Sequence, residues 1–199
     1  MKLTEPLRYK VNEIFYSLQG EGFHTGMPAV FVRLSGCNLS CDFCDTQHND
    51  GKDMTAHEIV EEVCGYPPCG RVIITGGEPT VHDLSSICDA LHDKGYAIHI
   101  ETNGTLPVKG DVDWVTCSPK EAASPHPYYV HPSLYERADE VKIVFTGDNG
   151  FEREAEKFIT KNRFLQPCSG MNTEETVNYI LSHPTWRLSL QTHRFLGIK

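Results

Sequence analysis

The sequence has no long apolar run and no basic tract, and both absences narrow its function. No stretch comes near the ~20 apolar residues that a membrane-spanning helix needs, and the N-terminus shows no apolar run of signal-peptide length. Net charge is -9, without an arginine-rich segment that could follow a phosphate backbone. We therefore expect a cytoplasmic protein with a small-molecule ligand, no nucleic-acid partner and no membrane partner.

Length and composition indicate one globular domain. The chain has 199 residues, of which 39% are hydrophobic and 23% are charged, so it is too apolar to be disordered. This length supports one hydrophobic core and is short for two. We expect a single domain over residues 1–199.

Short apolar or β-branched runs alternate with helical patterns along the chain. The runs predict buried strands at 29–34, 71–75, 96–101, 113–117, 140–145, 163–166 and 186–190. The helical patterns lie at 55–64, 82–94, 150–160 and 173–181. Alternation of this kind predicts an α/β fold with a parallel sheet, as either an open doubly wound sheet or an incomplete β/α barrel.

Local signals refine these elements. Thr55 with Glu58 has capping-box spacing, and Asn172 with Glu175 has nearly the same arrangement. Gly95 stands where a glycine would end a helix. Residues 102–110 and 118–132 are rich in Gly, Pro and His without helical period, which indicates shortened or missing helices.

Polar segments marked by Gly and Pro follow several of the expected strands. They are TGGEP at 75–79, ETNG at 101–104, SPK at 118–120 and QPCSG at 166–170. Barrels and open α/β sheets both place their sites at the C-terminal ends of parallel strands. We therefore expect the active site at this end of the sheet.

Three cysteines stand close together after the first of the expected strands. Cys37, Cys41 and Cys44 form C-x3-C-x2-C, which can hold three irons of a 4Fe-4S cluster and leave the fourth open to a chelating cofactor. The alternative is a zinc site with His48 as the fourth ligand, although structural zinc sites favour four closed ligands. The other five cysteines have no mutual metal spacing and are expected to be core or incidental residues.

The cysteine triplet and the TGGEP segment together resemble the radical S-adenosylmethionine superfamily. That resemblance implies that the open iron chelates the methionine end of S-adenosylmethionine, with Gly76, Gly77 and Glu78 near its amino group. The residue types agree, because glycines allow close approach of the backbone, and backbone carbonyls with a carboxylate accept hydrogen bonds from an ammonium.

Further segments narrow the resemblance to one family. These segments are LQGEG at 18–22, Arg33, CDT at 44–46, ETNG, SPK and QTH at 191–193. In this order, over nearly the whole chain, they resemble the 7-carboxy-7-deazaguanine synthase family. The resemblance implies a partial TIM-like β/α barrel of the radical SAM type. It also implies a lyase that converts 6-carboxy-5,6,7,8-tetrahydropterin to 7-carboxy-7-deazaguanine with release of ammonia, in queuosine biosynthesis.

The resemblance also assigns roles residue by residue. It implies a 4Fe-4S cluster on the three cysteines and a magnesium ion at Thr46. The residues implied to bind S-adenosylmethionine are Gly76, Gly77, Glu78, Gly104, Ser118, Pro119 and Lys120. Those implied to bind substrate are Leu18, Gln19, Gly20, Arg33, Thr102, Gln166 and His193. A homodimer and an electron donor such as flavodoxin are expected as well.

Several of these roles have a plain structural alternative. Arg33 at the end of a strand is either a surface cap or a ligand of the substrate carboxylate, which a planar guanidinium fits well. Lys120 and His193 are equally compatible with solvated positions. The family's chains often end in proline or alanine, whereas this one ends in Leu-Gly-Ile-Lys, which leaves the implied contact of the chain end open.

Two other functions fit the cysteine pattern. A glycyl-radical activase uses the same C-x3-C-x2-C spacing, but it needs a protein-sized docking surface, and the pterin-site segments argue against it. A non-catalytic zinc or iron-sulfur module is the other alternative. Iron content and cleavage of S-adenosylmethionine distinguish the three.

Overall fold

The structure is a computed structural model that describes residues 7–44, 46, 50–120, 129–147 and 150–199. Its strands are β1 (Arg8–Leu18), β2 (Pro28–Leu34), β3 (Lys52–Thr55), β4 (Arg71–Gly76), β5 (Ala97–Thr102), β6 (Trp114–Cys117), β7 (Glu140–Phe145), β8 (Arg163–Pro167) and β9 (Arg187–Leu188). Its α-helices are α1 (Ala56–Cys64), α2 (Ser85–His92), α3 (Leu134–Arg137), α4 (Glu152–Ala155), α5 (Thr173–Ser182) and α6 (Thr192–Leu196), with short 3-10 turns at Pro79–Val81 and Cys168–Gly170.

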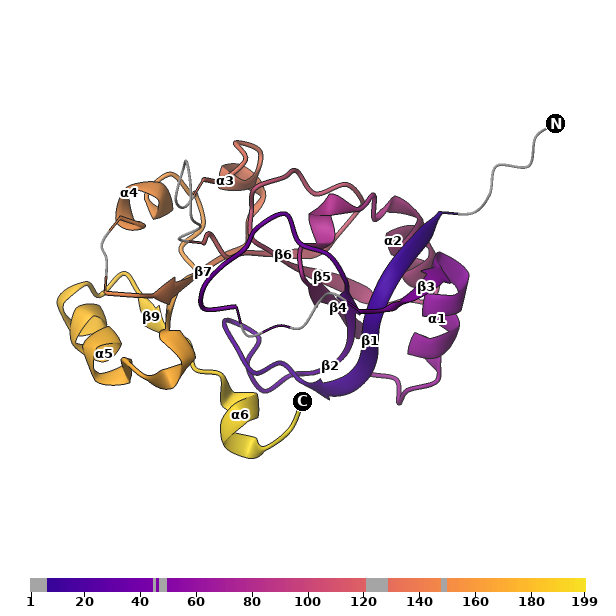
Figure 1. Cartoon of the computed structure of the whole chain (residues 1–199), viewed down its shortest axis with the longest axis horizontal. Coiled ribbons are helices and arrows are strands. Elements are labelled where there is room, and N and C mark those ends of the chain that lie inside the picture. The colour runs from indigo at the N-terminus through magenta and orange to yellow at the C-terminus, as the bar shows by residue number, and fades with distance from the viewer. Residues whose placement is uncertain (1–6, 45, 47–49, 121–128, 148–149) are drawn as a thin grey trace.

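All strands of the described chain belong to one sheet in the order β3-β1-β2-β4-β5-β6-β7-β8-β9. Neighbours from β2 to β9 run parallel, whereas β1 pairs antiparallel with both β2 and β3. The sheet curves with α1 to α5 around its outside (Figure 1). It does not close, because β3 and β9 are its edges. The predicted partial β/α barrel is therefore confirmed.

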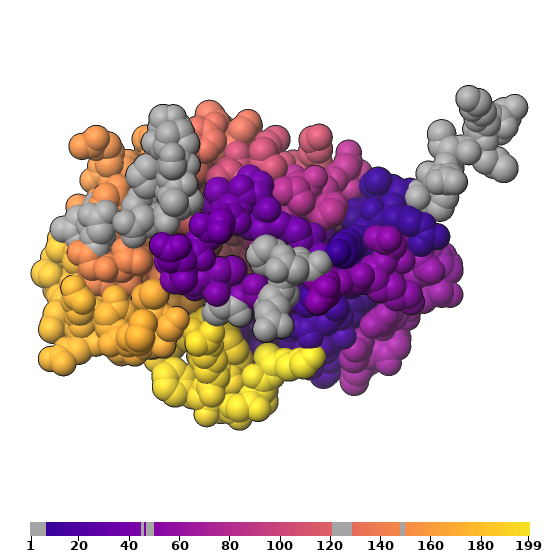
Figure 2. All heavy atoms as spheres, in the orientation of Figure 1, coloured from indigo at the N-terminus to yellow at the C-terminus, as the bar shows by residue number. Residues whose placement is uncertain are grey.

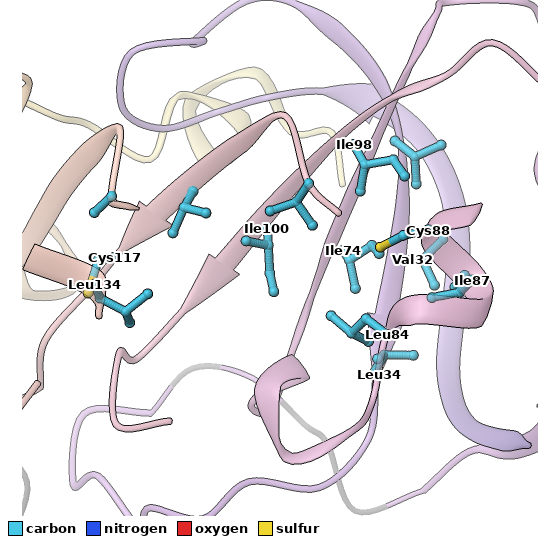
Figure 3. Packing of buried hydrophobic residues seen from close by; sticks show 14 of the residues in the cluster. Val32, Leu34, Ile74, Leu84, Ile87, Cys88, Ile98, Ile100, Cys117 and Leu134 are labelled. Atoms are coloured by element: carbon cyan, nitrogen blue, oxygen red, sulfur yellow. The ribbon is translucent and has the colours of Figure 1, made fainter. Parts of the chain in front are cut away.

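The outer face of the sheet carries the hydrophobic core. Alternate strand residues, among them Val32, Ile74 and Ile98, are buried and belong to one cluster with Leu84 and Ile87 of the α2 region. Figure 3 shows these side chains gathered between the sheet and α2. Full burial of an aliphatic side chain stabilises a fold by roughly 1.5–3 kcal/mol, so this layer fixes the positions of the strands.

The inner face of the same strands carries several polar side chains. Because strand side chains alternate between faces, the residues between the core positions point into the barrel. They include Arg33 of β2, Thr75 of β4, Glu101 of β5, Lys142 of β7 and Gln166 of β8, all of which line one cavity. The apolar strand patterns therefore conceal single polar residues that face the interior.

Each predicted strand and helix is present, but the structure also contains β1, β3, α3 and α6, and the bounds of some predicted elements differ. The seven predicted strands are present as β2 and β4 to β9, and the capping box of Thr55 and Glu58 is formed. Strands β1 and β3 were not predicted. Helix α4 spans only Glu152–Ala155 of the predicted 150–160, and α2 begins at Ser85, later than predicted. Asn172 does not cap α5, because its side chain instead bonds the backbone of Cys168 and Phe145.

The helices of the structure bear on the predicted lack of a membrane-spanning segment. In the described ranges, none of them has both the length and the apolar sequence to cross a bilayer.

Candidate active site

One cavity of about 790 Å³ opens at the C-terminal ends of the parallel strands. It brings together most of the residues predicted from the sequence, although they come from eight separate segments. Those that line it are Leu18, Gln19, Gly20, Arg33, Cys37, Cys41, Cys44, Thr46, Gly76, Gly77, Thr102, Ser118, Lys120, Gln166 and His193. Glu78, Gly104 and Pro119 are not among the lining residues.

The cysteine loop, residues 36–44, follows β2 and lies over the mouth of the cavity. Figure 2 shows this violet segment across the middle of the molecule, above the yellow C-terminal segment. Cys37 and Cys41 are half-buried and Cys44 is exposed, and all three are free thiols. Within the described ranges, no three His, Cys, Asp or Glu side chains are arranged to hold a single metal ion. His48 lies outside the described residues.

The cysteine loop rests on the TGGEP segment through its backbone. Gly77 N donates to Leu34 O at 3.0 Å, and Glu78 N donates to Gly36 O at 2.8 Å. A Cβ at position 77 would lie 2.0 Å from Gly36 O, so only glycine allows this approach. The two predicted motifs therefore form one packed unit.

Glu78 lies behind this unit and is fully buried. Its Oε1 accepts from Thr80 N at 3.0 Å, Thr80 Oγ1 at 2.6 Å and Thr102 Oγ1 at 2.6 Å, and its Oε2 accepts from Asn103 N at 2.6 Å. The carboxylate thus joins the segment after β4 to the segment after β5. In this arrangement it orients the lining residues.

The floor of the cavity is formed by the β1–β2 connection and the C-terminal segment. Gln19 Nε2 donates to Glu101 Oε1 at 2.9 Å, and Thr192 N donates to Gly20 O at 2.9 Å. A Cβ at Gly20 would lie 2.1 Å from the ring of His193. The predicted substrate residues at 19, 20 and 193 are therefore direct neighbours.

A buried charge cluster adjoins these segments and also lines the cavity. Lys142 is only 5% exposed and pairs with Glu21, and its Nζ is 3.7 Å from Glu101 Oε1. Burial lowers the pKa of Lys142, but Glu101 and Glu21 outweigh burial and raise it above its usual value. Burial raises the pKa of Glu21, but the neighbouring Lys142 outweighs burial and lowers this pKa to about 2. Lys142 and Glu21 therefore both stay charged.

Lys120 is a second cation of the cavity wall. Its Nζ donates to Ser118 Oγ at 2.7 Å, so two predicted cofactor residues hold each other in place. Burial lowers the pKa of this lysine, and the nearby Lys142 lowers it further. The side chain is therefore held within the site and is not a solvated loop lysine.

Arg33 stands at the opposite wall in an ion pair. Its Nε donates to Glu13 Oε1 at 3.0 Å, and Lys199 Nζ donates to Glu13 Oε2 at 2.6 Å. Both cations also lie over the ring of Phe15, at 5.7 Å and 5.3 Å from its centroid. Arg33 is thus oriented inside the cavity, which argues against a simple cap at the strand end.

Known proteins are similar to this chain over almost its whole length. A Bacteroides thetaiotaomicron protein named 7-carboxy-7-deazaguanine synthase is 51% identical over 193 residues, which cover 96% of this chain and 98% of the relative. A protein of the same name from Synechocystis sp. is 40% identical, with 96% and 94% covered. This chain belongs to the 7-carboxy-7-deazaguanine synthase family.

A family model and a solved structure also match this chain, and both are consistent with membership of the 7-carboxy-7-deazaguanine synthase family. Residues 31–123 match the family described as "Radical SAM superfamily", which includes the cysteine loop and the TGGEP segment. The structure titled "Crystal structure of QueE from Escherichia coli" superimposes with a TM-score of 0.78 at 32% identity, covering 94% of this chain and 95% of the other. The predicted radical SAM enzyme is confirmed, and membership implies a 4Fe-4S cluster and S-adenosylmethionine as cofactors.

Six charged residues that line this family member's site were not predicted as site residues, Glu21 and Arg194 among them. Glu13, Glu101, Lys142 and Lys199 all line the cavity. The signal for the strand residues was present, because Lys142 is a charged residue with an apolar neighbour on each side in EVKIVF. A charge at an inward position of a buried strand predicts a polar interior. No comparable signal identified Lys199, whose contact with Glu13 spans 186 positions.

Proposed function

We propose that the described cavity converts 6-carboxy-5,6,7,8-tetrahydropterin to 7-carboxy-7-deazaguanine with release of ammonia. The observation that carries the proposal is that the cysteine triplet and Arg33 face the same cavity of about 790 Å³. A volume of this order accommodates a cofactor-sized ligand together with a small bicyclic substrate. The family membership supports this reaction, because the relatives bear its name.

The cysteine loop fits a 4Fe-4S cluster. Cys37, Cys41 and Cys44 are free thiols of one loop that all line the cavity, and Leu39 N lies 3.4 Å from Cys37 Sγ, as a donor toward a ligand sulfur. When bound, such a cluster supplies the electron that cleaves S-adenosylmethionine to a 5'-deoxyadenosyl radical. The chain's own part is to hold the three thiolates and to shield the site from water.

The segments after β4, β5 and β6 are proposed to hold S-adenosylmethionine. The backbone at Gly76 and Gly77 offers carbonyl acceptors for the methionine ammonium, directly beside the cysteine loop. Ser118 and Lys120 line the cavity from the segment after β6. Glu78, Gly104 and Pro119 complete the proposed set from behind the lining residues, where Glu78 fixes the two loops.

The substrate is proposed to lie between the floor and Arg33. Leu18, Gln19 and Gly20 supply backbone groups, and Thr102, Gln166 and His193 complete the surrounding polar wall. A pterin ring carries several N–H donors and carbonyl acceptors, and the charged floor with Glu101 and Lys142 offers both kinds of partner. These residues orient the reacting carbon, which is catalysis by positioning.

The reaction itself is the direct test of this proposal. Anaerobically reconstituted protein, reduced in the presence of S-adenosylmethionine and the carboxylated pterin, should form 7-carboxy-7-deazaguanine and ammonia in equal amounts. Protein without iron would indicate the zinc module. Cleavage of S-adenosylmethionine without conversion of the pterin would indicate a different radical substrate, such as the glycine residue of an activase target.

Arg33 gives a test of substrate chemistry. The Arg33→Ala variant should bind the pterin about ten- to a hundredfold more weakly, because a charged hydrogen bond contributes roughly 1.5–3 kcal/mol. Arg33→Lys should lie in between, since it keeps the charge and loses the planar fork. Calorimetric titration measures both affinities. Arg71→Ala, at the first residue of β4, is the control and should bind the pterin as the wild type does. If Arg33→Ala also bound the pterin as tightly as the wild type, Arg33 would be only a strand-end residue and not a substrate ligand.

Thr46 is the proposed magnesium ligand. It is half-buried and lines the cavity beside Cys44, and magnesium commonly completes its shell with water and substrate oxygens. Removing divalent cations with a chelator should slow product formation strongly and leave the iron content unchanged, and added magnesium should restore the rate. Thr46→Val should require more magnesium for half-maximal rate. A rate that does not respond to magnesium in either protein would remove the ion from the site.

A homodimer, an electron donor such as flavodoxin and a cytoplasmic location complete the proposal. These follow from the family resemblance and the sequence composition, and sedimentation velocity of the holoenzyme measures the first of them.

A further inference from the structure

Three polar side chains join the cysteine loop to the segment after β5. Asn38 Nδ2 donates to Thr105 Oγ1 at 2.7 Å, and Asn103 Nδ2 donates to Asn38 Oδ1 at 3.0 Å. The third side of the triangle is closed by Thr105 Oγ1, which donates to Asn103 Oδ1 at 2.7 Å. We call Asn38, Asn103 and Thr105 the amide clasp.

The clasp is anchored on its barrel side. Asn103 is only 6% exposed, and its backbone N–H donates to the buried carboxylate of Glu78 at 2.6 Å. Its Oδ1 also accepts from Thr105 N at 2.9 Å, which fixes the rotamer of the amide. The half of the clasp on the segment after β5 is therefore held by hydrogen bonds that do not involve Asn38.

Asn38 is the exposed half of the clasp and lies on the cysteine loop. It directly follows Cys37 and precedes Cys41 by three positions. The backbone bonds from Gly77 and Glu78 hold only the base of the loop, at Leu34 and Gly36. The clasp ties the same loop on its other side, so the loop is fixed at two separate points.

The clasp also includes the proposed cofactor segment. Gly104 lies between Asn103 and Thr105, and its N–H donates to Thr102 Oγ1 at 3.0 Å. Any shift of Asn38 relative to Thr105 therefore changes the position of the cysteines relative to the residues proposed to hold S-adenosylmethionine. An exposed asparagine has no need of a protein partner, because water satisfies it at little cost. Its double engagement here indicates a positional role.

We propose that the amide clasp is a positioning device that sets the distance between the cluster-bearing loop and the S-adenosylmethionine segment. The clasp residues do not touch the reacting atoms; they act through the three cysteines and Gly104. This inference rests on the proposed cluster and cofactor sites, and is independent of the identity of the substrate.

The test removes each half of the clasp separately. Thr105→Val keeps the side-chain shape and loses the hydroxyl, and Asn38→Ala loses the amide. Both variants should keep wild-type iron content and unfold at nearly the wild-type denaturant concentration. Both should bind S-adenosylmethionine about three- to tenfold more weakly, as expected for loss of one or two hydrogen bonds. The change that S-adenosylmethionine causes in the EPR spectrum of the reduced cluster should be smaller or altered in shape.

Two further variants sharpen the result. Asn38→Ala/Thr105→Val should lose no more affinity than the worse single variant, because both break the same unit. Asn162→Ala is the matched control, since Asn162 donates one amide hydrogen bond to Asp139 O at 2.9 Å before β8. It should leave the EPR response unchanged even where it lowers stability.

The outcomes separate this inference from the proposed function. Wild-type affinity and an unchanged EPR response in Thr105→Val and Asn38→Ala would overturn the clasp, even where the pterin is converted normally. Weakened cofactor binding in both variants, in a protein that does not convert the pterin, would support the clasp and reject the proposed substrate. Loss of iron in both variants would also overturn it, because the clasp would then be part of cluster retention.

Discussion

Cys41→Ala should lose the iron-sulfur absorbance after anaerobic reconstitution and form no detectable product. Cys41 lies in the middle of the triplet and lines the cavity, and alanine offers no thiolate. Two remaining cysteines leave two irons of the cubane without protein ligands, which does not retain the cluster. Iron per chain and the visible spectrum measure the result. The fold should persist, because Cys41 is outside the hydrophobic core.

Cys69→Ala is the matched control for this change. Cys69 lies before β4, at the N-terminal end of the strands, and its thiol lies 3.2 Å from Arg71 O. It is packed beside the core and is absent from the cavity lining. This variant should keep its iron and its turnover. Folded Cys69→Ala without iron would show that the three-cysteine assignment is wrong.

Lys142→Met should destabilise the fold by about 3–5 kcal/mol, the typical cost of leaving a buried charge without its partner. The Lys142 side chain is 7% exposed and the Glu21 side chain 15% exposed, so water compensates little of the lost ion pair. Methionine fills a similar volume, so the loss is mainly electrostatic. Denaturant unfolding should give a lower midpoint with an unchanged slope.

The same variant should respond to pH in a defined direction. Without the ammonium, the Glu21 carboxylate keeps its burial and loses its main counter-charge, so its pKa rises above the unfolded one. Stability of Lys142→Met should therefore be greatest below the unfolded carboxyl pKa and fall as pH rises. Glu21→Gln added to this variant should recover part of the loss, whereas Lys94→Met, at an exposed site after α2, should cost little. Equal stability of Lys142→Met and Lys94→Met would contradict the buried pair.

The sequence was sufficient for the parallel part of the fold. Runs such as RVIITG and EVKIVF are short and rich in β-branched residues, which favours a buried strand, and each formed a strand as predicted. Strand β1 was missed because RYKVNEIFYSL mixes charged and apolar residues along its whole length. β1 is a strand because it pairs antiparallel with β2, and this pairing is a tertiary contact that the local pattern does not predict. Strand β3 has only four residues, three of them polar, and pairs with β1.

The segment at 150–160 shows how tertiary contact overrides helical spacing. Phe151, Ala155 and Phe158 do enter the core, as a helical stripe predicts. The helix nevertheless ends at Ala155, and Ile159 N bonds Tyr135 O at 3.0 Å, so the chain turns toward α3. The apolar residues were predicted correctly, and the shape of the backbone between them was not.

The site was predictable where its residues form motifs and not where they act singly. The cysteine triplet, TGGEP, ETNG and SPK each lie at a strand end, which is why their convergence could be expected. Glu101 is part of the ETNG motif, but the hydrogen bond that it accepts from Gln19 depends on where the β1–β2 connection lies in the fold. The contact of Lys199 with Glu13 depends on the last turn of the described chain, after Gly197 in the left-handed conformation.

The wall built by residues 191–199 has a consequence for the order of events during synthesis. The cysteine loop and the strands β1, β2 and β4 that support it are complete before residue 80, whereas Ser17 Oγ meets Lys199 O at 2.5 Å across 182 positions. The contacts that complete this side of the cavity therefore join the first strand to residue 199, so they form only after all nine strands of the described chain have been made.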